Sequence, residues 1–250
     1  MEMKSQTPTA QEKHPVFLED QRAFFDELIS KEWESYLSPE WDNSRRFEVA
    51  RIFRLIGSPP HRITDMGCGC GFHDLVMASQ PGVEEVVGID YSPMSIQRAN
   101  AAYPHPKVTR QVGDVFSLPP GGADLVVSFQ VIEHLQDADQ FVRACSAQAA
   151  PGGFVAIATP NRHRLMNRLR RLVGRPEQLS DPQHYREYTL MDLRRMGEAA
   201  GLVLHGGFGH SMSLYIPGVR CNVLPQPVVL HAGNRLPGWA DVVCAVFRKA

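Results

Sequence analysis

The chain has 250 residues, of which 43% are hydrophobic and 21% are charged, and its formal net charge is -1 at pH 7. These values describe one globular domain with decorations and exclude a disordered or fibrous protein. A nearly neutral chain has no overall field to attract nucleic acid, so we expect no nucleic-acid partner. No stretch approaches the roughly 20 apolar residues that cross a bilayer. The first fifteen residues also lack the apolar core of a signal peptide, which predicts a cytoplasmic protein.

The N-terminal part of the chain divides into a tail and a helical segment. Residues 1–15 are polar and contain proline, so we expect them to be a disordered tail. Residues 16–58 carry two helical patterns before any strand, one over Phe17–Leu37 and a second that includes Val49–Ile56. The glycine and prolines of Gly57–Pro60 are expected to end the second helix.

Residues 59–250 alternate short apolar runs with helical patterns of about ten to twenty residues. This alternation predicts βαβ units and therefore an α/β fold, three-layered and doubly wound around a mostly parallel sheet of seven strands. The late stretch 207–240 contains four prolines and is predicted to be a long irregular loop. The seven strands are expected at Arg62–Met66, Val86–Asp90, Val108–Val112, Ala123–Phe129, Phe154–Thr159, Leu202–Gly206 and Asp241–Phe247.

The sharpest motif is the run Asp65-Met66-Gly67-Cys68-Gly69-Cys70-Gly71, in which a predicted strand enters three alternating glycines and then a helix. Glycine permits positive φ and close approach of a ligand to the backbone, and a helix N-terminus offers free N–H groups. A dinucleotide fingerprint requires G-x-G-x-x-G, whereas Phe72 stands where its last glycine belongs. The spacing therefore disfavours NAD as the ligand.

Two acidic residues follow the glycines, each after a predicted strand. Asp90 ends the second strand nineteen residues after Gly71, where a carboxylate can accept both ribose hydroxyls of a nucleoside. Ser92 and Pro93 are expected to be the N-cap and the first residue of the next helix. Asp114 follows the third strand. Because ligands of open α/β sheets bind at the carboxyl ends of the strands, these residues predict one nucleoside site.

In this order and spacing the motifs resemble those of the class I S-adenosylmethionine-dependent methyltransferases, whose first motif is an acid, an apolar residue and G-x-G-x-G. The resemblance implies a Rossmann-like fold for residues 59–250, S-adenosylmethionine as cofactor and S-adenosylhomocysteine as product. The helices of residues 16–58 lie before these motifs, and we expect them to form a cap over the substrate. The cofactor-binding residues that it implies are Asp65, Gly67, Gly69, Gly71, Asp90, Tyr91, Met94, Asp114, Val115 and Gln130.

A narrower resemblance covers residues 60 to 205 and rests on five short segments. Glu133-His134, Phe141–Cys145, Pro151–Gly153, Thr159–Arg162 and His184–Tyr188 look like the ubiquinone-biosynthesis O-methyltransferases and their small-molecule relatives. This resemblance implies a small-molecule acceptor that is methylated on oxygen. Two alternatives stay open, namely a small-molecule N-methyltransferase and a non-catalytic S-adenosylmethionine-binding protein.

Methyl transfer is an in-line displacement in which the enzyme aligns the acceptor and often removes its proton. His134 is the first candidate for the general base, because it lies just past the fourth predicted strand and histidine titrates near neutrality. Glu133 would then orient His134, and His184 is the second candidate base. The alternative is that Glu133 and His134 only cap or pack the cofactor loop.

Metal dependence is a further question, because the ubiquinone O-methyltransferases and the small-RNA 2'-O-methyltransferases carry an E-x-x-E-H motif that can hold a divalent cation. Here Gln130 replaces the first glutamate of that motif. A neutral amide weakens a site for a hard cation, which prefers charged oxygen ligands. The sequence therefore predicts no metal site, with a divalent metal as the less favoured alternative.

The segment Arg162–Arg175 contains six arginines in fourteen residues, with leucines on a neighbouring stripe. It is predicted to be a basic amphipathic helix. Its arginines form either a solvated face or a contact with an anionic acceptor or an anionic membrane surface. RNA is not expected as a partner, because no aromatic residues are interleaved with the arginines.

Overall fold

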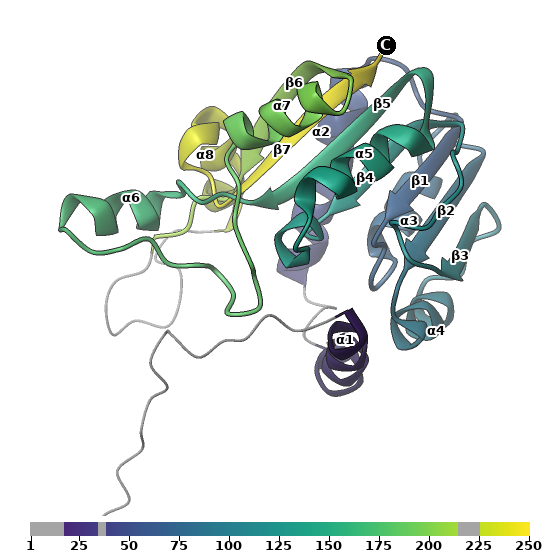
Figure 1. Ribbon diagram of the computed structural model, residues 1–250, viewed down its shortest axis with the longest axis horizontal. Helices are drawn as coiled ribbons and strands as arrows, with labels where there is room; N and C mark the ends of the chain where they lie inside the picture. Colours follow the sequence, from purple (N-terminus) through teal and green to yellow (C-terminus); the bar gives the residue numbers. More distant parts are fainter. Residues whose placement is uncertain (1–17, 35–38, 215–225) are drawn as a thin grey trace, which may run out of the picture.

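A seven-stranded sheet runs through the molecule in the order β3-β2-β1-β4-β5-β7-β6 (Figure 1). The computed structural model describes residues 18–34, 39–214 and 226–250, so the predicted tail of residues 1–15 lies outside the described residues. The first five strands pair in parallel, and β7 is antiparallel to both of its neighbours. The strands are β1 (Arg62–Met66), β2 (Glu85–Asp90), β3 (Val108–Val112), β4 (Ala123–Phe129), β5 (Ala149–Pro160), β6 (Leu202–His210) and β7 (Val242–Lys249).

Helices cover both faces of this sheet, and two of them precede the first strand, as the sequence predicts. In Figure 1, α5 and α7 lie in front of the sheet and α2 lies behind it. The helices are α1 (Leu18–Glu32), α2 (Pro39–Ile56), α3 (Phe72–Ala78), α4 (Pro93–Ala102), α5 (Ala138–Gln148), α6 (Leu165–Leu172), α7 (Leu190–Ala199) and α8 (Gln226–Arg235), with short 3-10 turns at η2 (Ile132–His134) and η3 (Pro237–Trp239). The prediction of a three-layer α/β fold with a mostly parallel sheet is confirmed.

The core consists of two apolar clusters, one on each face of the sheet. Ile52 of α2 and Phe72 of α3 belong to the first cluster, and Phe141 of α5 and Leu193 of α7 belong to the second. Alternate residues of β5 enter opposite clusters, which is the pattern of a strand buried on both faces. The helix α7 can pack closely on the sheet because Gly197 has no side chain; a Cβ at this position would overlap the Phe247 ring.

The late stretch 207–240 is more regular than the sequence predicts. The strand β6 continues through His210 instead of ending at Gly206, and α8 occupies Gln226–Arg235. The glycines of this strand resemble a turn in the sequence, but antiparallel pairing with β7 satisfies their backbone groups and buries Phe208. Residues 215–225, the middle of the predicted loop, lie outside the described residues.

The basic helix α6 is shorter than the predicted Arg162–Arg175 and spans only Leu165–Leu172. Arg164 occupies its N-cap position, and Gly174 has a left-handed φ of 69° that turns the chain beyond the helix. In Figure 1 this helix projects from one end of the molecule. Within the described ranges, no helix combines the length and the apolar character that crossing a membrane requires.

Candidate active site

Three glycines lie where β1 ends at the carboxyl edge of the sheet. Gly67 and Gly71 have positive φ values of 86° and 74°. A Cβ on Gly67 would overlap Val131, and one on Gly71 would lie 2.6 Å from Arg110 Nε, so packing excludes a side chain at both positions. A Cβ on Gly69 would meet no atom within 4 Å. Val131 and Arg110 therefore pack against the loop at Gly67 and Gly71, whereas the space beside Gly69 is open. This arrangement suits a ligand that lies against the backbone.

Asp90 connects this glycine loop to the start of α4. Its Oδ2 accepts a hydrogen bond from Gly69 N at 2.8 Å, and its Oδ1 accepts one from Ser92 N at 2.9 Å. Burial raises the pKa of Asp90, and the two backbone donors oppose that rise. Each carboxylate oxygen has a second lone pair, so the group can still accept hydroxyl donors from a ligand. The predicted N-cap is also present, since Ser92 accepts from Ser95 N.

Asp65 lies buried at the end of β1 beside a second buried acid, Asp74. Arg110 Nε lies 2.7 Å from Asp74 Oδ2, and both side chains are at most 1% exposed. Among the described residues neither oxygen of Asp65 has a hydrogen-bond partner. Burial and the neighbouring Asp74 charge raise the pKa of Asp65 well above its ordinary value. Such a buried carboxyl costs free energy unless a hydrogen-bonding group of Asp74 or of a ligand reaches it.

The start of α4 is covered by α1. Asp26 accepts hydrogen bonds from the Ser92 hydroxyl and, at 3.3 Å, from Met94 N. The Arg22 guanidinium lies 5.5 Å from the centroid of the Tyr91 ring. Two of the predicted cofactor-binding residues, Tyr91 and Met94, therefore stand beside the N-terminal helix, a contact that the sequence did not predict.

Asp114 and Val115 follow β3 at the same edge. Asp114 Oδ1 accepts from Phe116 N at 2.9 Å, and Oδ2 accepts from the Ser117 hydroxyl at 2.9 Å. Val115 is half-buried against the second core cluster. The carboxylate of Asp114 thus stabilises the turn of residues 114–117, and its remaining lone pairs can accept a hydrogen bond from a ligand.

The loop after β4 begins at Gln130, which has a left-handed φ of 57° although it is not glycine. Such a conformation costs about 1–3 kcal/mol and is found preferentially at functional sites. Its N–H donates to the carbonyl of Ala158 at 3.0 Å. This turn directs the chain into η2, which carries Glu133 and His134 to the end of β5.

The three predicted catalytic side chains come together at this point. The rings of His134 and His184 are 4.7 Å apart between centroids and nearly perpendicular. Donor or acceptor atoms of Glu133, His134 and His184 all lie within 4.8 Å of one another, an arrangement that is also suited to a metal ion. The sequence placed two of these residues on one turn, and the fold adds the third from fifty residues further along the chain.

Burial controls the charge of this cluster. Glu133 is fully buried, its Oε2 accepts from the Thr159 hydroxyl at 2.9 Å, and its Oε1 has no partner among the described residues. Burial raises the pKa of Glu133 to about 7. Burial, followed by the nearby His184, lowers the pKa of His134 to about 4. His134 is consequently an uncharged imidazole at neutral pH.

Four residues near this cluster were not assigned a role from the sequence. Phe25 of α1 stands edge-on to His134, with ring centroids 5.4 Å apart. Behind His184, its neighbour Glu187 is buried and forms an ion pair with Arg164. Ser180 completes this group by donating to Glu187 at 2.6 Å. Two of the four carry a sequence signal, because Glu187 lies within the segment His184–Tyr188 and Arg164 within the arginine-rich segment Arg162–Arg175.

A second buried polar cluster joins α2 to the opposite face of the same edge. Glu48 bridges two imidazoles, with Oε2 2.9 Å from His73 Nε2 and Oε1 2.8 Å from His210 Nε2. The ring of His73 stacks on Phe129 at 3.7 Å. Burial alone would raise the pKa of Glu48, but the charges and hydrogen bonds of His210 and His73 lower it to about 2. The sequence signal for Glu48 is its position four residues before the apolar Ile52, which places both residues on the same, buried face of the helix.

Comparison with known proteins agrees with this geometry. Residues 32–205 match the family described as "Methyltransferase domain". The chain belongs to the class I S-adenosylmethionine-dependent methyltransferases. The match covers more than half of this methyltransferase, including the glycine loop and all three residues of the histidine-containing cluster.

Individual relatives differ in how much of the methyltransferase they share. A probable S-adenosylmethionine-dependent methyltransferase of Mycolicibacterium smegmatis is 33% identical over 59% of this chain, and the chain spans only 54% of that relative's length. A ubiquinone biosynthesis O-methyltransferase of Chromobacterium violaceum is 32% identical over 74% of this chain and 88% of its own length. The solved structure of the N-methyltransferase NodS from Bradyrhizobium japonicum, in complex with S-adenosylhomocysteine, has a TM-score of 0.58 at 16% identity and covers 91% of this chain and 97% of its own. The structural likeness shows a shared fold.

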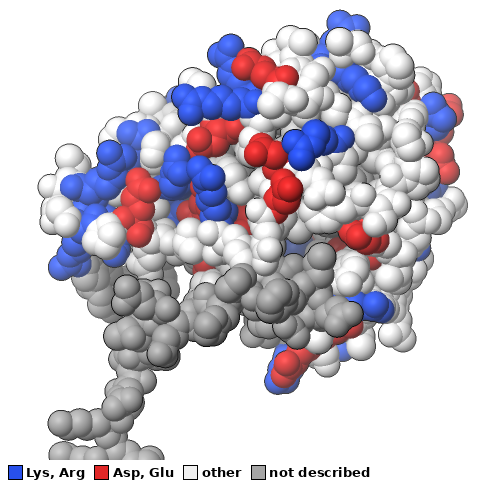
Figure 2. All heavy atoms as spheres, viewed as in Figure 1, with Lys and Arg blue, Asp and Glu red and all other residues white. Residues whose placement is uncertain are grey.

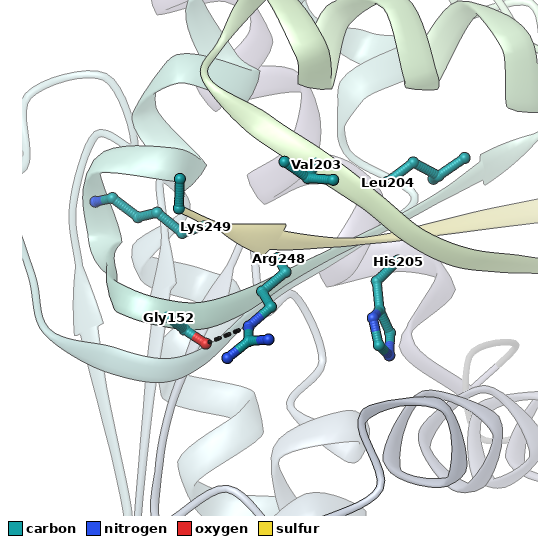
Figure 3. A pocket seen from close by; sticks show the side chains of 7 residues that line it. Gly152, Val203, Leu204, His205, Arg248 and Lys249 are labelled. Carbon is teal, nitrogen blue, oxygen red and sulfur yellow. Dashed lines mark hydrogen bonds between the residues drawn. The ribbon is translucent and has the colours of Figure 1, made fainter.

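A hollow of about 450 Å³ lies elsewhere on the methyltransferase, and Figure 3 shows its lining. Val203 and His205 near the start of β6, Gly152 of β5 and Arg248 of β7 contribute to it. These residues stand at the amino edge of β5 and β6, opposite the glycine loop. None of the predicted site residues lines this hollow.

Proposed function

We propose that this protein transfers the methyl group of S-adenosylmethionine to a hydroxyl group of a small-molecule acceptor. The observation that carries the proposal is the meeting of two imidazoles, His134 and His184, and the buried Glu133 at the end of β4, beside the glycine loop. An oxygen acceptor must lose a proton during transfer, and an uncharged imidazole is the side chain best suited to take it at neutral pH.

The residues of the glycine-loop side fit the cofactor. When bound, S-adenosylmethionine supplies an electrophilic methyl on a sulfonium, whose carbon–sulfur bond breaks with the electron pair passing to sulfur. Asp90 would hold the ribose hydroxyls, and the buried carboxyl of Asp65 would accept a hydrogen bond from a donor group of the cofactor. As the family resemblance implies, Tyr91, Met94, Asp114 and Val115 would surround the adenine, and Gln130 would face the methionine part.

The acceptor side would then handle one proton. The acceptor O–H bond breaks, its proton moves to an imidazole nitrogen of His134 or His184, and the oxygen electron pair forms the new bond to the methyl carbon. The imidazolium afterwards releases the proton to water. Phe25 of α1 lies against His134 and would exclude water from that space, which supports a role of residues 16–58 as a substrate cap.

An amine acceptor is the second candidate, and a non-catalytic cofactor-binding protein is the third. An ammonium group would find the Glu133 carboxyl as its partner, since Glu133 Oε1 has no hydrogen bond among the described residues. The hydroxyl acceptor is favoured because two histidines flank that carboxyl and provide a base that a neutral amine does not need.

The experiment has a binding arm and a turnover arm. Thermal melts with S-adenosylmethionine, S-adenosylhomocysteine and NAD, each at about 100 times a plausible dissociation constant, should show stabilisation of about 2.7 kcal/mol by the two adenosyl compounds and none by NAD. Turnover is then followed as S-adenosylhomocysteine formed with catechols, phenols, aliphatic alcohols and amines. Methylation of hydroxyl compounds is expected. Turnover of amines alone would replace the oxygen assignment, and binding without turnover would favour the non-catalytic alternative.

We also propose that α6 contacts an anionic membrane surface. Basic side chains gather over α6 in Figure 2, with acidic ones between them. Beyond them Leu172 is 80% exposed and Val173 is 70% exposed, so the helix offers apolar side chains next to Arg170 and Arg171. Exposed apolar residues flanked by arginine are suited to the boundary between headgroups and acyl chains.

Vesicle flotation tests this contact. The protein should float with vesicles that contain phosphatidylglycerol and not with pure phosphatidylcholine. The double variant Arg170→Glu/Arg171→Glu should abolish flotation, and the matched pair Arg194→Glu/Arg195→Glu on α7 should not. Equal loss in both variants would show that net charge alone governs binding. Protection of α6 by inorganic phosphate without flotation would indicate an anionic acceptor instead.

A further inference from the structure

We propose that Glu187 is a positioning residue that fixes His184, and not His134, as the group that takes the acceptor's proton. This inference rests on the proposed hydroxyl methylation and adds a residue that the sequence motif did not assign. It is carried by the hydrogen bonds around one buried carboxylate in the segment between α6 and α7.

Glu187 is enclosed on all sides by donors. Its side chain has no exposed surface, and its Oε2 forms an ion pair with Arg164. Its Oε1 accepts from the Ser180 hydroxyl at 2.6 Å and from the Ser180 backbone N–H, and it lies 3.2 Å from His184 Nδ1. The carboxylate is thus fixed in place by two residues and directed at one nitrogen of His184.

The charge of Glu187 determines which nitrogen of His184 carries the hydrogen. Burial alone would raise the pKa of Glu187, but hydrogen bonds from His184 and Ser180 and the charge of Arg164 lower it to about 2. An ionised carboxylate only accepts hydrogen bonds, so His184 Nδ1 must be the N–H nitrogen. The lone pair of the neutral ring then lies on Nε2, the nitrogen that is left to face an acceptor.

His134 has a different environment. It lies between the rings of Phe25 and His184, and burial lowers its pKa to about 4. A base whose pKa is that far below the working pH provides little driving force for proton transfer. Behind the His184 ring the Glu187 carboxylate lies 3.2 Å from Nδ1 and orients the ring, as in carboxylate–histidine pairs generally. His134 then serves as a wall of the site.

The proton transfer balances without any further reactant. The acceptor O–H bond breaks, the proton binds to His184 Nε2, and the oxygen keeps the electron pair that attacks the methyl carbon. The new positive charge on His184 faces the Glu187 anion, whose own partner is Arg164. Water receives the proton after product release, and the original tautomer returns.

A purely structural role is the competing explanation. The Arg164–Glu187 pair closes the loop between α6 and α7, together with the hydrogen bonds of Asn167 to the backbone of Gln178. If this were its entire role, loss of Glu187 would lower stability and would act independently of His184. A positioning role makes the two residues non-additive in turnover.

The first measurement needs no acceptor. In protein labelled with ¹⁵N-histidine, the His184 resonances are assigned by their loss in His184→Asn, and the positions of the ring nitrogens give the tautomer near pH 8. We expect the Nδ1–H tautomer in the wild type and a mixture of tautomers in Glu187→Gln. An Nε2–H tautomer in the wild type would overturn the proposal.

The second measurement uses the hydroxyl acceptor that the wild type turns over fastest. Glu187→Gln should lower kcat at least tenfold, with KM for both substrates within twofold, and Glu187→Asp should recover part of the loss. In a His184→Ala background Glu187→Gln should change kcat less than twofold, whereas independent effects would overturn the proposal. Should Glu187→Gln not fold, Glu187→Asp and the wild-type tautomer still decide the question.

The control is Asp192→Asn. Asp192 also pairs with an arginine, Arg162 at 3.1 Å, and caps the neighbouring helix α7, but it is not one of the site residues. It should lower Tm and leave kcat unchanged. If the wild type methylates no hydroxyl compound, the proposed function fails, while the tautomer of His184 still tests the role of Glu187 separately.

Discussion

The two halves of the proposed active site, the glycine-loop side and the acceptor side, are built in different ways. On the glycine-loop side, Asp65, Asp90 and Asp114 lie at or just after the ends of strands, and Asp90 and Asp114 accept hydrogen bonds from backbone N–H groups. The acceptor side joins α1, η2 and the segment before α7, which lie far apart in the chain. A ligand common to a whole family can be bound by strand ends, whereas a variable acceptor is surrounded by elements that vary in length and position.

The largest expected effect tests whether the glycine-loop side depends on a buried charge. Arg110→Met would leave the buried carboxyl of Asp74 without its ion-pair partner and would remove the donors to the carbonyls of Gly71 and Ala99. We expect a loss of about 3–5 kcal/mol in the free energy of unfolding, measured with urea. Arg143→Met on the exposed face of α5 should change it by less than about 0.5 kcal/mol. A loss below about 1 kcal/mol for Arg110→Met would show that the loop is held by packing alone.

The next effect concerns the anchor of α2 and depends on pH. The pKa of Glu48 is about 2 in the folded protein against 4.5 ordinarily. A lowered pKa stabilises the fold above pH 4.5, and this stabilisation is lost as the pH falls through about 2. Unfolding free energies at pH 7, 5, 4 and 3 should therefore fall, by on the order of 2 kcal/mol between pH 7 and pH 3. Glu48→Gln should flatten this dependence, and Glu85→Gln, an exposed carboxylate on β2, should leave it intact.

The third effect separates turnover from binding. His184→Ala should lower kcat by about 10²-fold or more, because general-base catalysis contributes about 10²–10⁴-fold. The affinity for S-adenosylhomocysteine, measured by calorimetry, should stay within twofold. His134→Ala should reduce kcat less than His184→Ala does. If either variant weakened the binding of S-adenosylhomocysteine by as large a factor as it lowers kcat, the two halves of the site would not be independent.

The fourth effect is the reverse of the third. Asp90→Ala removes a carboxylate that would hold the ribose, and we expect cofactor binding to weaken by about 1.5–3 kcal/mol. With saturating cofactor, kcat should recover to near the wild-type value. Asp139→Ala on the exposed side of α5 is the matched control and should not change the affinity. Unchanged affinity in Asp90→Ala would show that Asp90 does not hold the ribose and would contradict the proposed cofactor site.

The smallest expected effect concerns metal. Glu133, His134 and His184 are close enough to share an ion, but burial raises the pKa of Glu133 to about 7, so the carboxyl is only partly ionised at neutral pH. Together with the neutral Gln130, this favours turnover without a cation. Dialysis against EDTA should leave kcat within twofold. A large loss that Mg²⁺ or Mn²⁺ restores would make the cluster a metal site and contradict the prediction.

Sequence patterns predicted the first half of the fold more accurately than the second. The strands Arg62–Met66 and Val108–Val112 and the Ser92 cap follow from local signals, and the structure has them at the predicted residues. The extension of β6 through His210 depends on pairing with β7, which no local pattern reports. Likewise, nothing near Glu187 in the sequence shows that Arg164 will pair with it across the α6 loop. Long-range contacts of this kind form only when the elements are assembled.

The position of α1 has a kinetic consequence. Through Asp26 it is bonded to the start of α4 beside the nucleoside residues, and through Phe25 it touches His134 in the other half of the site. Under the proposed function this helix would lie over both ligands, and its displacement would uncover both at once. Loading of donor and acceptor and departure of both products would then be a single gated event, and we expect the maximal turnover rate to be bounded by how often this helix opens.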